Sequence, residues 1–390
     1  DSTSPTMTIT AAEVTDGGTS NDGTIVLTFT SSEATTNFAE ADITVIGGAL
    51  SAFNATSSTV YAATFTPSAD GATTIDVAAN TFTDAVGNNN TAATQFNWTY
   101  DGTAPTMTIT AAEVTDGGTS NDGTIALTFT SSEATTNFDV NDITVTNGTL
   151  SSFTGSGTAY TATFTPSAEG ATTINVVGGA FTDLAGNNNT AATEFNWTYD
   201  SAAPTITVYS DTTGVTDGST TSDATIALTF TTVLETSNFV VGDITPGNGA
   251  LSSFTAVSGT VYTATFTPSG LGACTIDVAA GAFTDSSSNN NTAATQFNWT
   301  YNSPPIVTGT TVASNNSTIA VTFSKAVYNT NGGSGDLQAS DFALSISGGV
   351  ATVNATPSSI SVSGNVYTLG LTLSGTPDGA ETLTVVPSSS

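Results

Sequence analysis

The sequence predicts an all-β chain, a tandem array of Greek-key β-sandwiches with about seven strands each. Three observations support this prediction. A segment of about 100 residues recurs, with a proline near each start and a tryptophan near each end, namely Pro5, Pro105 and Pro204, then Trp98, Trp197 and Trp299. Within it, apolar and polar residues alternate with a period of two. Clusters of Asp, Gly and Asn separate these alternating runs, as turns do.

The repeats set the expected domain boundaries. Repeat 1 is predicted at residues 1–101, repeat 2 at 102–200, repeat 3 at 201–302, and a diverged repeat 4 at 303–390. A period of this size fits one sandwich domain rather than one unit of a solenoid.

Alternation predicts the strands of repeat 1 in chain order: A at 7–10, B at 24–30, a short C ending at Phe38, D at 42–45, E at 60–66, F at 73–77 and G at 93–100. In strand B the inward face carries Ile25, Leu27 and Phe29, because alternate side chains of a strand point the same way. Repeat 4 offers comparable runs at 306–312, 318–323, 342–346, 366–373 and 382–386. The sequence shows no counterpart of the aromatic strand G there, so we expect the last repeat to lack its final strand.

Three short runs resemble bacterial immunoglobulin-like (Big-type) repeats: residues 99–105 (TYDGTAP), 42–45 (DITV) and 82–88 (FTDAVGN). The resemblance covers residues 1–302 closely and 303–390 more loosely. It implies immunoglobulin-like sandwiches of the kind that form long tandem arrays in large surface proteins, adhesins and filaments.

Composition excludes several function classes. The chain has 32 Asp and Glu residues against one cation, Lys325, and no His, which gives a net charge of −31. Such a charge repels nucleic acid and anionic membranes, and it is best tolerated in salty or calcium-containing water outside the cell. No run approaches about 18 consecutive apolar residues, so no membrane span is expected. Without His, and with Lys325 and Cys274 in different repeats, we expect no enzymatic activity. Cys274 aligns with Thr73 and is interpreted as a small buried core residue.

The expected function is therefore that of a non-enzymatic extracellular stalk or filament shaft, as a fragment of a longer cell-surface protein. Near-identical repeats favour length as the useful property. The alternative is an adhesin that binds a cell surface or glycans through repeat 4 or through a tip domain outside these residues.

Short linkers and sandwich topology bring acidic loops together where repeats meet. At the first joint we expect Asp16, Asp22, Asp70 and Asp101 of repeat 1 to meet Glu133, Asp183 and Asn187 of repeat 2; at the second, Asp116, Asp122, Glu169 and Asp200 to meet Glu235 and Asp285. Calcium accepts six to eight such oxygens, so a structural Ca²⁺ at each joint is one hypothesis. The other is that these residues only form turns, as Asp and Asn do through their own backbones.

The third joint departs from this pattern. Lys325 stands at the position of Glu33, and Asn302 at that of the linker aspartates. One hypothesis is that Lys325 replaces the metal and pairs with Asp217 or Asp223; the other is an exposed lysine on a loop.

Two further predictions concern partners and modification. A missing strand G in repeat 4 leaves a sheet edge that a neighbouring copy could fill, which would build a filament; alternatively the chain is a piece of a longer array, with Asp1 the linker residue of an earlier repeat. Glycans are expected on sequons if the source organism glycosylates asparagine, on strand G and on one loop: Asn97, Asn196 and Asn298, then Asn89, Asn188 and Asn290.

Overall fold

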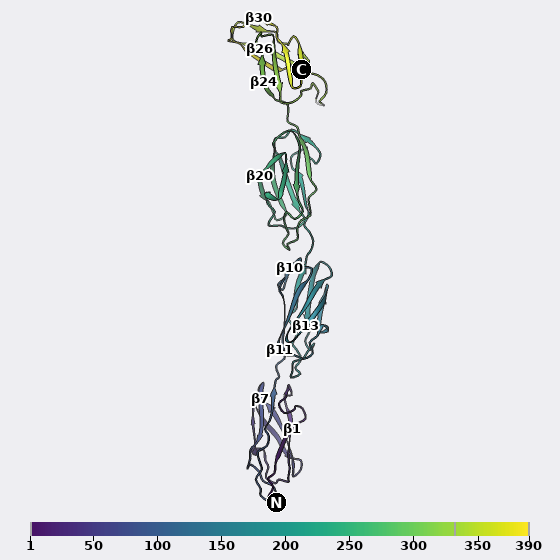
Figure 1. Cartoon of the computed structure of the whole chain (residues 1–390), viewed down its shortest axis with the longest axis vertical. Helices are drawn as coiled ribbons and strands as arrows, with labels where there is room; N and C mark the ends of the chain where they lie inside the picture. Colours follow the sequence, from purple (N-terminus) through teal and green to yellow (C-terminus); the bar gives the residue numbers. More distant parts are fainter. Residues whose placement is uncertain (1, 331–332, 389–390) are drawn as a thin grey trace. The chain divides into compact units, whose positions relative to one another are not determined.

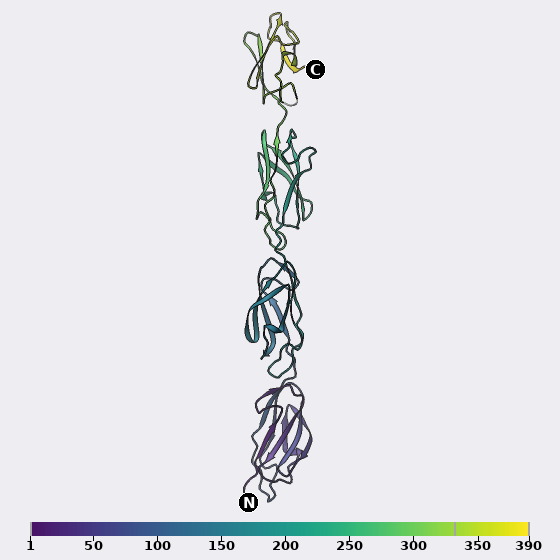
Figure 2. The same cartoon turned by 90° about the vertical axis from the view of Figure 1, so that its right-hand side faces the viewer.

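The computed structural model describes residues 2–330 and 333–388. Within these residues the chain is built of strands and turns, with 3-10 turns as the only helices, and none of them is long or apolar enough to cross a membrane. The chain divides into two compact units, Asp1–Pro204 with Thr284–Asn291, and Thr205–Phe283 with Thr292–Ser390. The strands of each repeat are continuous in colour, so each sandwich folds from neighbouring sequence (Figures 1 and 2). The interpretation of Asp1 as a linker residue lies outside the described residues.

Repeat 1 folds as two packed sheets. Its elements are β1 (Met7–Ala11), β2 (Thr19–Ser20), β3 (Ile25–Ser31), η1 (Glu40–Asp42), β4 (Ile43–Ile46), β5 (Gly48–Ala55), β6 (Val60–Pro67), β7 (Gly71–Val77) and β8 (Phe96–Tyr100). One sheet has the order β1-β3-β6-β5 and the other β2-β8-β7-β4. This is the ABED and A′GFC arrangement of an immunoglobulin-like sandwich, which confirms the predicted fold class.

Repeats 2 and 3 repeat this arrangement. The elements of repeat 2 are β9 (Met107–Ala111), β10 (Gly118–Ser120), β11 (Ile125–Thr135), η2 (Val140–Asp142), β12 (Ile143–Thr146), β13 (Gly148–Pro166), β14 (Gly170–Val176) and β15 (Phe195–Tyr199). Those of repeat 3 are β16 (Ile206–Ser210), β17 (Thr220–Thr221), β18 (Ile226–Thr232), η3 (Val241–Asp243), β19 (Ile244–Gly247), β20 (Gly249–Ala256), β21 (Val261–Pro268), β22 (Gly272–Val278) and β23 (Phe297–Tyr301). In repeat 2, strands D and E are continuous as β13, so that sheet contains three strands.

One strand assignment from the sequence is wrong. The segment predicted as strand D, now β4, pairs with β7 and is therefore strand C. Strand D is β5, which pairs with β6 at the sheet edge and was not predicted. Its alternation is broken by a register shift between Ser51 and Asn54, where Ala52 has a φ of 51°. The short strand predicted to end at Phe38 is a loop that leads into η1.

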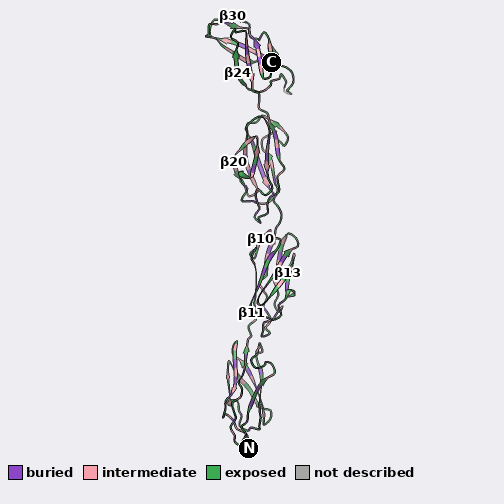
Figure 3. Cartoon of the chain, viewed as in Figure 1, coloured by how far each residue is buried: buried purple, intermediate pink, exposed green. Residues whose placement is uncertain are grey.

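Alternation sets the core of each sandwich. Ile25, Leu27 and Phe29 are fully buried, while Val26 is 49% exposed. Figure 3 shows buried and exposed residues following one another along the strands. Trp98 lies on the inner face of β8 and meets Phe65 edge to face at 6.2 Å between ring centroids. Burying each such side chain contributes about 1.5–3 kcal/mol.

Two polar anchors hold the loop before strand C. The Asp42 carboxylate accepts the Ala39 N–H at 2.8 Å and caps η1, and the Tyr61 hydroxyl donates to the Thr35 carbonyl at 3.0 Å. Equivalent caps recur in the other three repeats, at Asp142, Asp243 and Asp341. These anchors fix the position of the loop whose residues reach the preceding linker.

Repeat 4 is an incomplete version of the same sandwich. Its elements are β24 (Val307–Val312), β25 (Thr318–Phe323), η4 (Ala339–Asp341), β26 (Phe342–Ser347), β27 (Thr352–Val353), β28 (Ile360–Ser363), β29 (Val366–Gly370), β30 (Leu373–Ser374) and β31 (Thr382–Pro387). The ABED sheet is present as β24-β25-β29-β28. Strands C and F form the pair β26-β31, and no described residue of this repeat supplies strand G beside them. The expected absence of strand G therefore holds for the described residues.

Candidate functional site

The loop between strands F and G carries the central acid of each junction. In repeat 2, Asp183 is 3% exposed, and its carboxylate accepts the N–H groups of Gly186 and Asn187 at 2.8 and 2.9 Å. The Asn187 side chain also donates to it, at 3.0 Å. Asp84 and Asp285 make matching bonds within their own loops. The loop is thus shaped by its own aspartate, as the turn-former hypothesis requires.

The same loop holds the linker that precedes its repeat. The Asn187 side chain donates to the Asp101 carbonyl at 2.8 Å, and the Asn21 N–H of repeat 1 donates to the Ala185 carbonyl at 3.2 Å. These bonds join the two repeats within the first unit. Asn187 therefore bonds both the loop aspartate and the linker.

Three carboxylates converge at this first junction. One oxygen from each of Asp101, Glu133 and Asp183 lies within 4.8 Å of the other two. Glu133 comes from the loop between strands B and C, and it is half-buried. Burial raises the pKa of Glu133, and the charges of Asp101, Asp183 and Asp70 raise it further. We call Asp101, Glu133 and Asp183 the junction triad; it is a site of concentrated negative charge.

Asp70 orders the linker beside the triad. Its carboxylate accepts the Thr103 hydroxyl and, at 2.8 Å, the Gly102 N–H. Both bonds favour the charged form, and they lower the pKa of Asp70 below its usual value. Glu169 has the same role one repeat later, where it accepts the Ser201 hydroxyl at 2.8 Å.

The second junction keeps the linker bond but has no triad. The Asn289 side chain donates to the Asp200 carbonyl at 2.9 Å, and the Ser287 hydroxyl donates to the Asp200 carboxylate at 2.7 Å. Asp285 lies in the same loop, and loop and linker both belong to the first unit. Among the described residues, a group of three convergent acids occurs only at the first junction. Repeat 3 has Leu234 at the aligned position of Glu133.

Four of the predicted ligands and the two predicted partners of Lys325 are engaged elsewhere, each inside its own repeat. Asp16, Asp116 and Asp217 accept the backbone N–H of strand G at 2.7–2.8 Å, from Asn97, Asn196 and Asn298. Asp22, Asp122 and Asp223 accept the hydroxyls of Ser20, Ser120 and Thr221. The structure therefore does not bring these six acids into the junction triad. They stabilise the segment between strands A and B.

At the third junction, Lys325 donates to the Asn302 side chain. The hypothesis that its partner is Asp217 or Asp223 is not supported, because both carboxylates bond residues of their own repeat. Lys325 and Asn302 occupy the aligned positions of Glu133 and Asp101. A contact between a cation and a neutral amide thus replaces two facing acids.

The six candidate glycosylation sites fall into two groups. Asn89, Asn188 and Asn290 are exposed on the loop between strands F and G. On strand G, Asn97, Asn196 and Asn298 are half-buried, and the Asn97 amide donates to the Gln95 carbonyl at 3.2 Å. The loop positions are sterically the more open to a glycan.

Sequence reasoning missed a buried asparagine that holds this loop. Asn90 is 2% exposed; its side chain accepts the N–H groups of Thr81 and Phe82 and donates to the Ala78 and Thr91 carbonyls. Asn189 and Asn291 occupy the same position and are equally buried. The Asn-Asn-Asn run that recurs in each complete repeat could have indicated such a residue, because an exposed asparagine is followed there by a buried one.

The chain has low sequence identity to the solved structures that it resembles. The Escherichia coli adhesin FdeC is 15% identical with a TM-score of 0.38, over 77% of this chain and 98% of that one. Invasin, a bacterial integrin-binding protein, is 17% identical with a TM-score of 0.33, over 93% and 73%. InvD of Yersinia pseudotuberculosis is 17% identical with a TM-score of 0.26, over 73% and 85%. A search of curated proteins finds no match.

Family comparison gives a direct result. A model of the bacterial Ig-like domain matches residues 1–100, 101–199 and 200–301, one after another. These segments coincide with the three complete sandwiches and cover most of the sequence. The chain therefore belongs to the bacterial Ig-like domain family, of which it carries three tandem copies.

Proposed function

We propose that this chain is a non-enzymatic extracellular spacer, a stalk or filament shaft whose repeats are held at fixed junctions. The linker bond of the junctions supports this proposal best. Asn187 donates to the Asp101 carbonyl and Asn289 to the Asp200 carbonyl, so each of these two linkers is bound by the loop between strands F and G of the repeat that follows. A linker tied down in this way loses the freedom of a flexible chain. The net charge of −31 suits a salty medium outside the cell.

Distance measurements between repeats test the fixed junction. Spin labels on Thr30→Cys and Thr130→Cys occupy equivalent exposed positions in repeats 1 and 2, in a Cys274→Thr background. A fixed junction gives one narrow distance distribution, comparable in width to a pair within repeat 1 on Thr30→Cys and Ser68→Cys. Asn187→Ala should broaden the first distribution and leave the second unchanged. A broad distribution in the unsubstituted chain would remove the basis of the proposal.

Imaging of the native assembly on the producing cells tests the location and separates the two surface roles. A regular polymer containing this chain supports a filament shaft. A single protruding chain with a distinct tip supports the adhesin alternative, in which repeat 4 or a further domain makes the contact. Labelling confined to the cell interior would contradict both.

We further propose that the junction triad binds calcium. Three carboxylates within 4.8 Å repel one another unless a proton or a cation lies among them. Asp183 already accepts three N–H groups, so Asp101 and Glu133 would supply most of the protein oxygens, and water the rest.

Calcium titration with and without EGTA tests this part separately. Binding should raise the melting temperature and narrow the distance distribution across the first junction. The second junction, which has no triad, serves as the internal control. A melting curve that EGTA leaves unchanged would exclude calcium while leaving the spacer proposal intact.

A further inference from the structure

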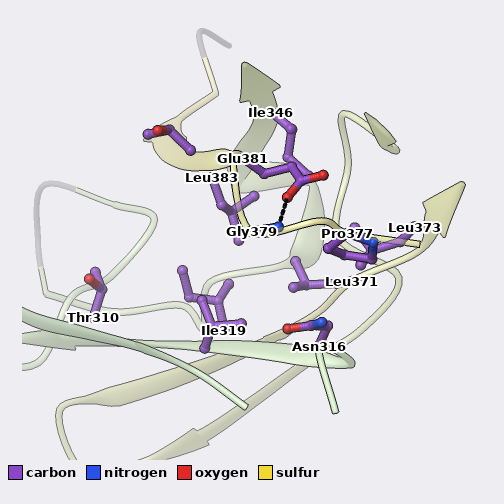
Figure 4. Close-up of a pocket in the computed structure, with 12 residues that line it drawn as sticks. Thr310, Asn316, Ile319, Ile346, Leu371, Leu373, Pro377, Gly379, Glu381 and Leu383 are labelled. Atoms are coloured by element: carbon purple, nitrogen blue, oxygen red, sulfur yellow. Dashed lines mark hydrogen bonds between the residues drawn. The ribbon is translucent and has the colours of Figure 1, made fainter. Parts of the chain in front are cut away.

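Repeat 4 has an open groove where the other repeats bury a strand. The groove has a volume of about 630 Å³, and its walls carry Val312, Ile319, Ile346, Leu371, Leu373 and Leu383. Figure 4 shows Ile319, Leu371 and Leu383 directed into the same space. It lies between the two sheets, beside strand F of this repeat. β31 pairs with β26 along one edge only, as far as the described residues show.

The missing strand leaves apolar positions uncovered. Sixteen described residues form the buried core of each complete repeat, against six in repeat 4. On strand A, Met7 and Ile9 are buried in repeat 1, whereas every residue of β24 is exposed and Val312 is 43% exposed. On strand F, Ile75 is fully buried, but its equivalent Val385 is only half-buried. The groove is thus an unfilled core rather than an ordinary surface hollow.

Register shows which side chain the groove would receive. Strand C starts at Ile43 in repeat 1 and at Phe342 in repeat 4, and their partners on strand F are Val77 and Pro387. Counting back along strand F, Leu383 occupies the position of Thr73, whose partner on strand G is Trp98.

The opposite wall gives the same answer. Tyr61 and Tyr367 make the same hydroxyl bond to the loop before strand C, so Leu371 occupies the position of Phe65. Phe65 is the ring that Trp98 meets edge to face. The space between Leu371 and Leu383 is therefore the tryptophan position of the sandwich.

We propose that this groove binds an extended peptide segment with aromatic residues at alternate positions, added antiparallel to β31 as strand G. The three complete repeats supply the chemistry of the occupant, because each fills this place with Phe-Asn-Trp-Thr-Tyr. These three strands are all paired in their own sheets, so a second copy of residues 2–388 has none to offer. The occupant that we propose is therefore a partner polypeptide whose extended segment carries aromatic residues at alternate positions.

The contact is apolar along its face and hydrogen-bonded along its edge. The indole N–H of Trp98, Trp197 and Trp299 is buried without an acceptor among the described residues, so the position requires a large ring rather than a donor. Affinity would come from burial of the rings and from main-chain bonds to β31, as in strand addition to other sheets.

A peptide with the sequence of Glu194–Asp200 (EFNWTYD) is the probe, added to the full chain at high salt to screen the acidic charge. We expect saturable binding and new hydrogen-exchange protection along residues 381–385, which correspond in register to the residues of repeat 1 that pair with strand G. A peptide with Trp→Phe should still bind, whereas one with Trp→Ser should bind at least about tenfold more weakly, because the lost ring contributes more than about 1.4 kcal/mol.

Matched variants place the binding in the groove. Leu383→Asp should weaken binding at least about tenfold, because the carboxylate loses water without gaining a cation. Thr384→Asp, on the outer face of the same strand, should not. Val312→Asp repeats the test at an exposed wall position in case Leu383→Asp unfolds the repeat.

Three results would overturn the proposal: no binding at peptide solubility, equal binding of the Trp→Ser peptide, or no new protection within residues 381–385. Concentration-dependent dimerisation that protects the same residues without peptide would instead identify a second copy as the occupant.

Discussion

At the third junction Lys325 donates a hydrogen bond to Asn302. These two residues occupy the aligned positions of Glu133 and Asp101, whose carboxylates face each other at the first junction. The two junctions use aligned positions of the same fold, one on the linker and one on the loop between strands B and C. A cation and an amide attract each other, whereas two carboxylates repel each other unless a proton or a cation lies between them. The difference predicts that the third junction holds without metal.

Replacing Lys325 tests this directly. Lys325→Ala removes the donor, and we expect a broader distance distribution between spin labels on Thr267→Cys of repeat 3 and Ser361→Cys of repeat 4. Lys325→Arg keeps a charged donor and should preserve the width. Stability should change by less than about 1 kcal/mol, because the contact is exposed. A width unchanged by Lys325→Ala would show that the bond does not orient the junction.

Glu133 should make the first junction weaken as pH rises when calcium is absent. Burial and the neighbouring acids raise the pKa of Glu133 above 4.5, so Glu133 stays protonated to a higher pH in the folded state than in the unfolded state. The stability that the protonated Glu133 contributes is therefore fully present below pH 4.5, and it is lost as pH rises through the higher pKa of the folded state. In EGTA, Glu133→Gln should remove this loss and stabilise the junction at neutral pH by at most about 1 kcal/mol, since solvent screens the charge.

Calcium reverses the expected sign for the same variant. At saturating calcium, Glu133→Gln removes a ligand, so the calcium-induced rise in melting temperature should shrink. Glu33→Gln, the aligned position in repeat 1, is the control and should leave the calcium effect unchanged. A variant that behaves identically with calcium and with EGTA would argue that the triad binds no metal.

Asn90 should contribute far more to stability than its neighbour Asn89. Asn90→Ala leaves the N–H groups of Thr81 and Phe82 without their buried acceptor, at a cost of about 2–3 kcal/mol. Asn89 is exposed, so Asn89→Ala should change stability by less than about 0.5 kcal/mol. Hydrogen exchange in repeat 1 measures both, with repeat 2 as the internal reference. Equal protection in the two variants would contradict the assigned role.

Cys274 should report the opening of repeat 3. The thiol is fully buried and burial raises its pKa, so a thiol reagent should react only when the repeat unfolds. Cys274→Thr should be tolerated within about 1 kcal/mol, because Thr73 at the same position donates to the Trp98 carbonyl. Rapid labelling under native conditions would show that the strand opens locally.

The sequence was most informative where one face of a strand is buried. Ile25, Leu27 and Phe29 alternate without interruption, and they lie on the inner face as predicted. Strand D could not be found in this way, because it lies at an edge and a left-handed residue at Ala52 breaks its period. Edge strands contribute little to the core, so their sequences need not alternate between apolar and polar residues as those of central strands do.

Loop order predicts which acids come close together only where side-chain direction does not intervene. Topology places the loops of Glu133 and Asp183 at the same end of repeat 2, and with Asp101 these residues do lie together. Asp16 and Asp217 also follow strand A, but their carboxylates turn to the N–H groups of strand G. Such a bond depends on side-chain direction, about which loop order contains no information.

Glu381 should give repeat 4 its own acid sensitivity. Although desolvation opposes it, backbone N–H groups of Ala351, Asp378 and Gly379 donate to the carboxylate and lower the pKa of Glu381 to about 2. Because the folded pKa lies below the ordinary 4.5, the stability that these bonds supply is fully present above pH 4.5 and is lost as pH falls toward 2.

Urea denaturation at pH 6 and pH 3, followed by the NMR signals of repeat 4, measures this loss. Glu381→Gln should lower the midpoint at pH 6 and abolish most of the difference between the two pH values. Asp336→Asn, at an exposed position of the same repeat, should keep the difference.

The Glu381 carboxylate also lines the groove beside Leu383, so acid that frees the Gly379 turn should weaken peptide binding in the same pH range. Peptide affinity that is constant from pH 6 to pH 3 would show that this turn does not shape the groove.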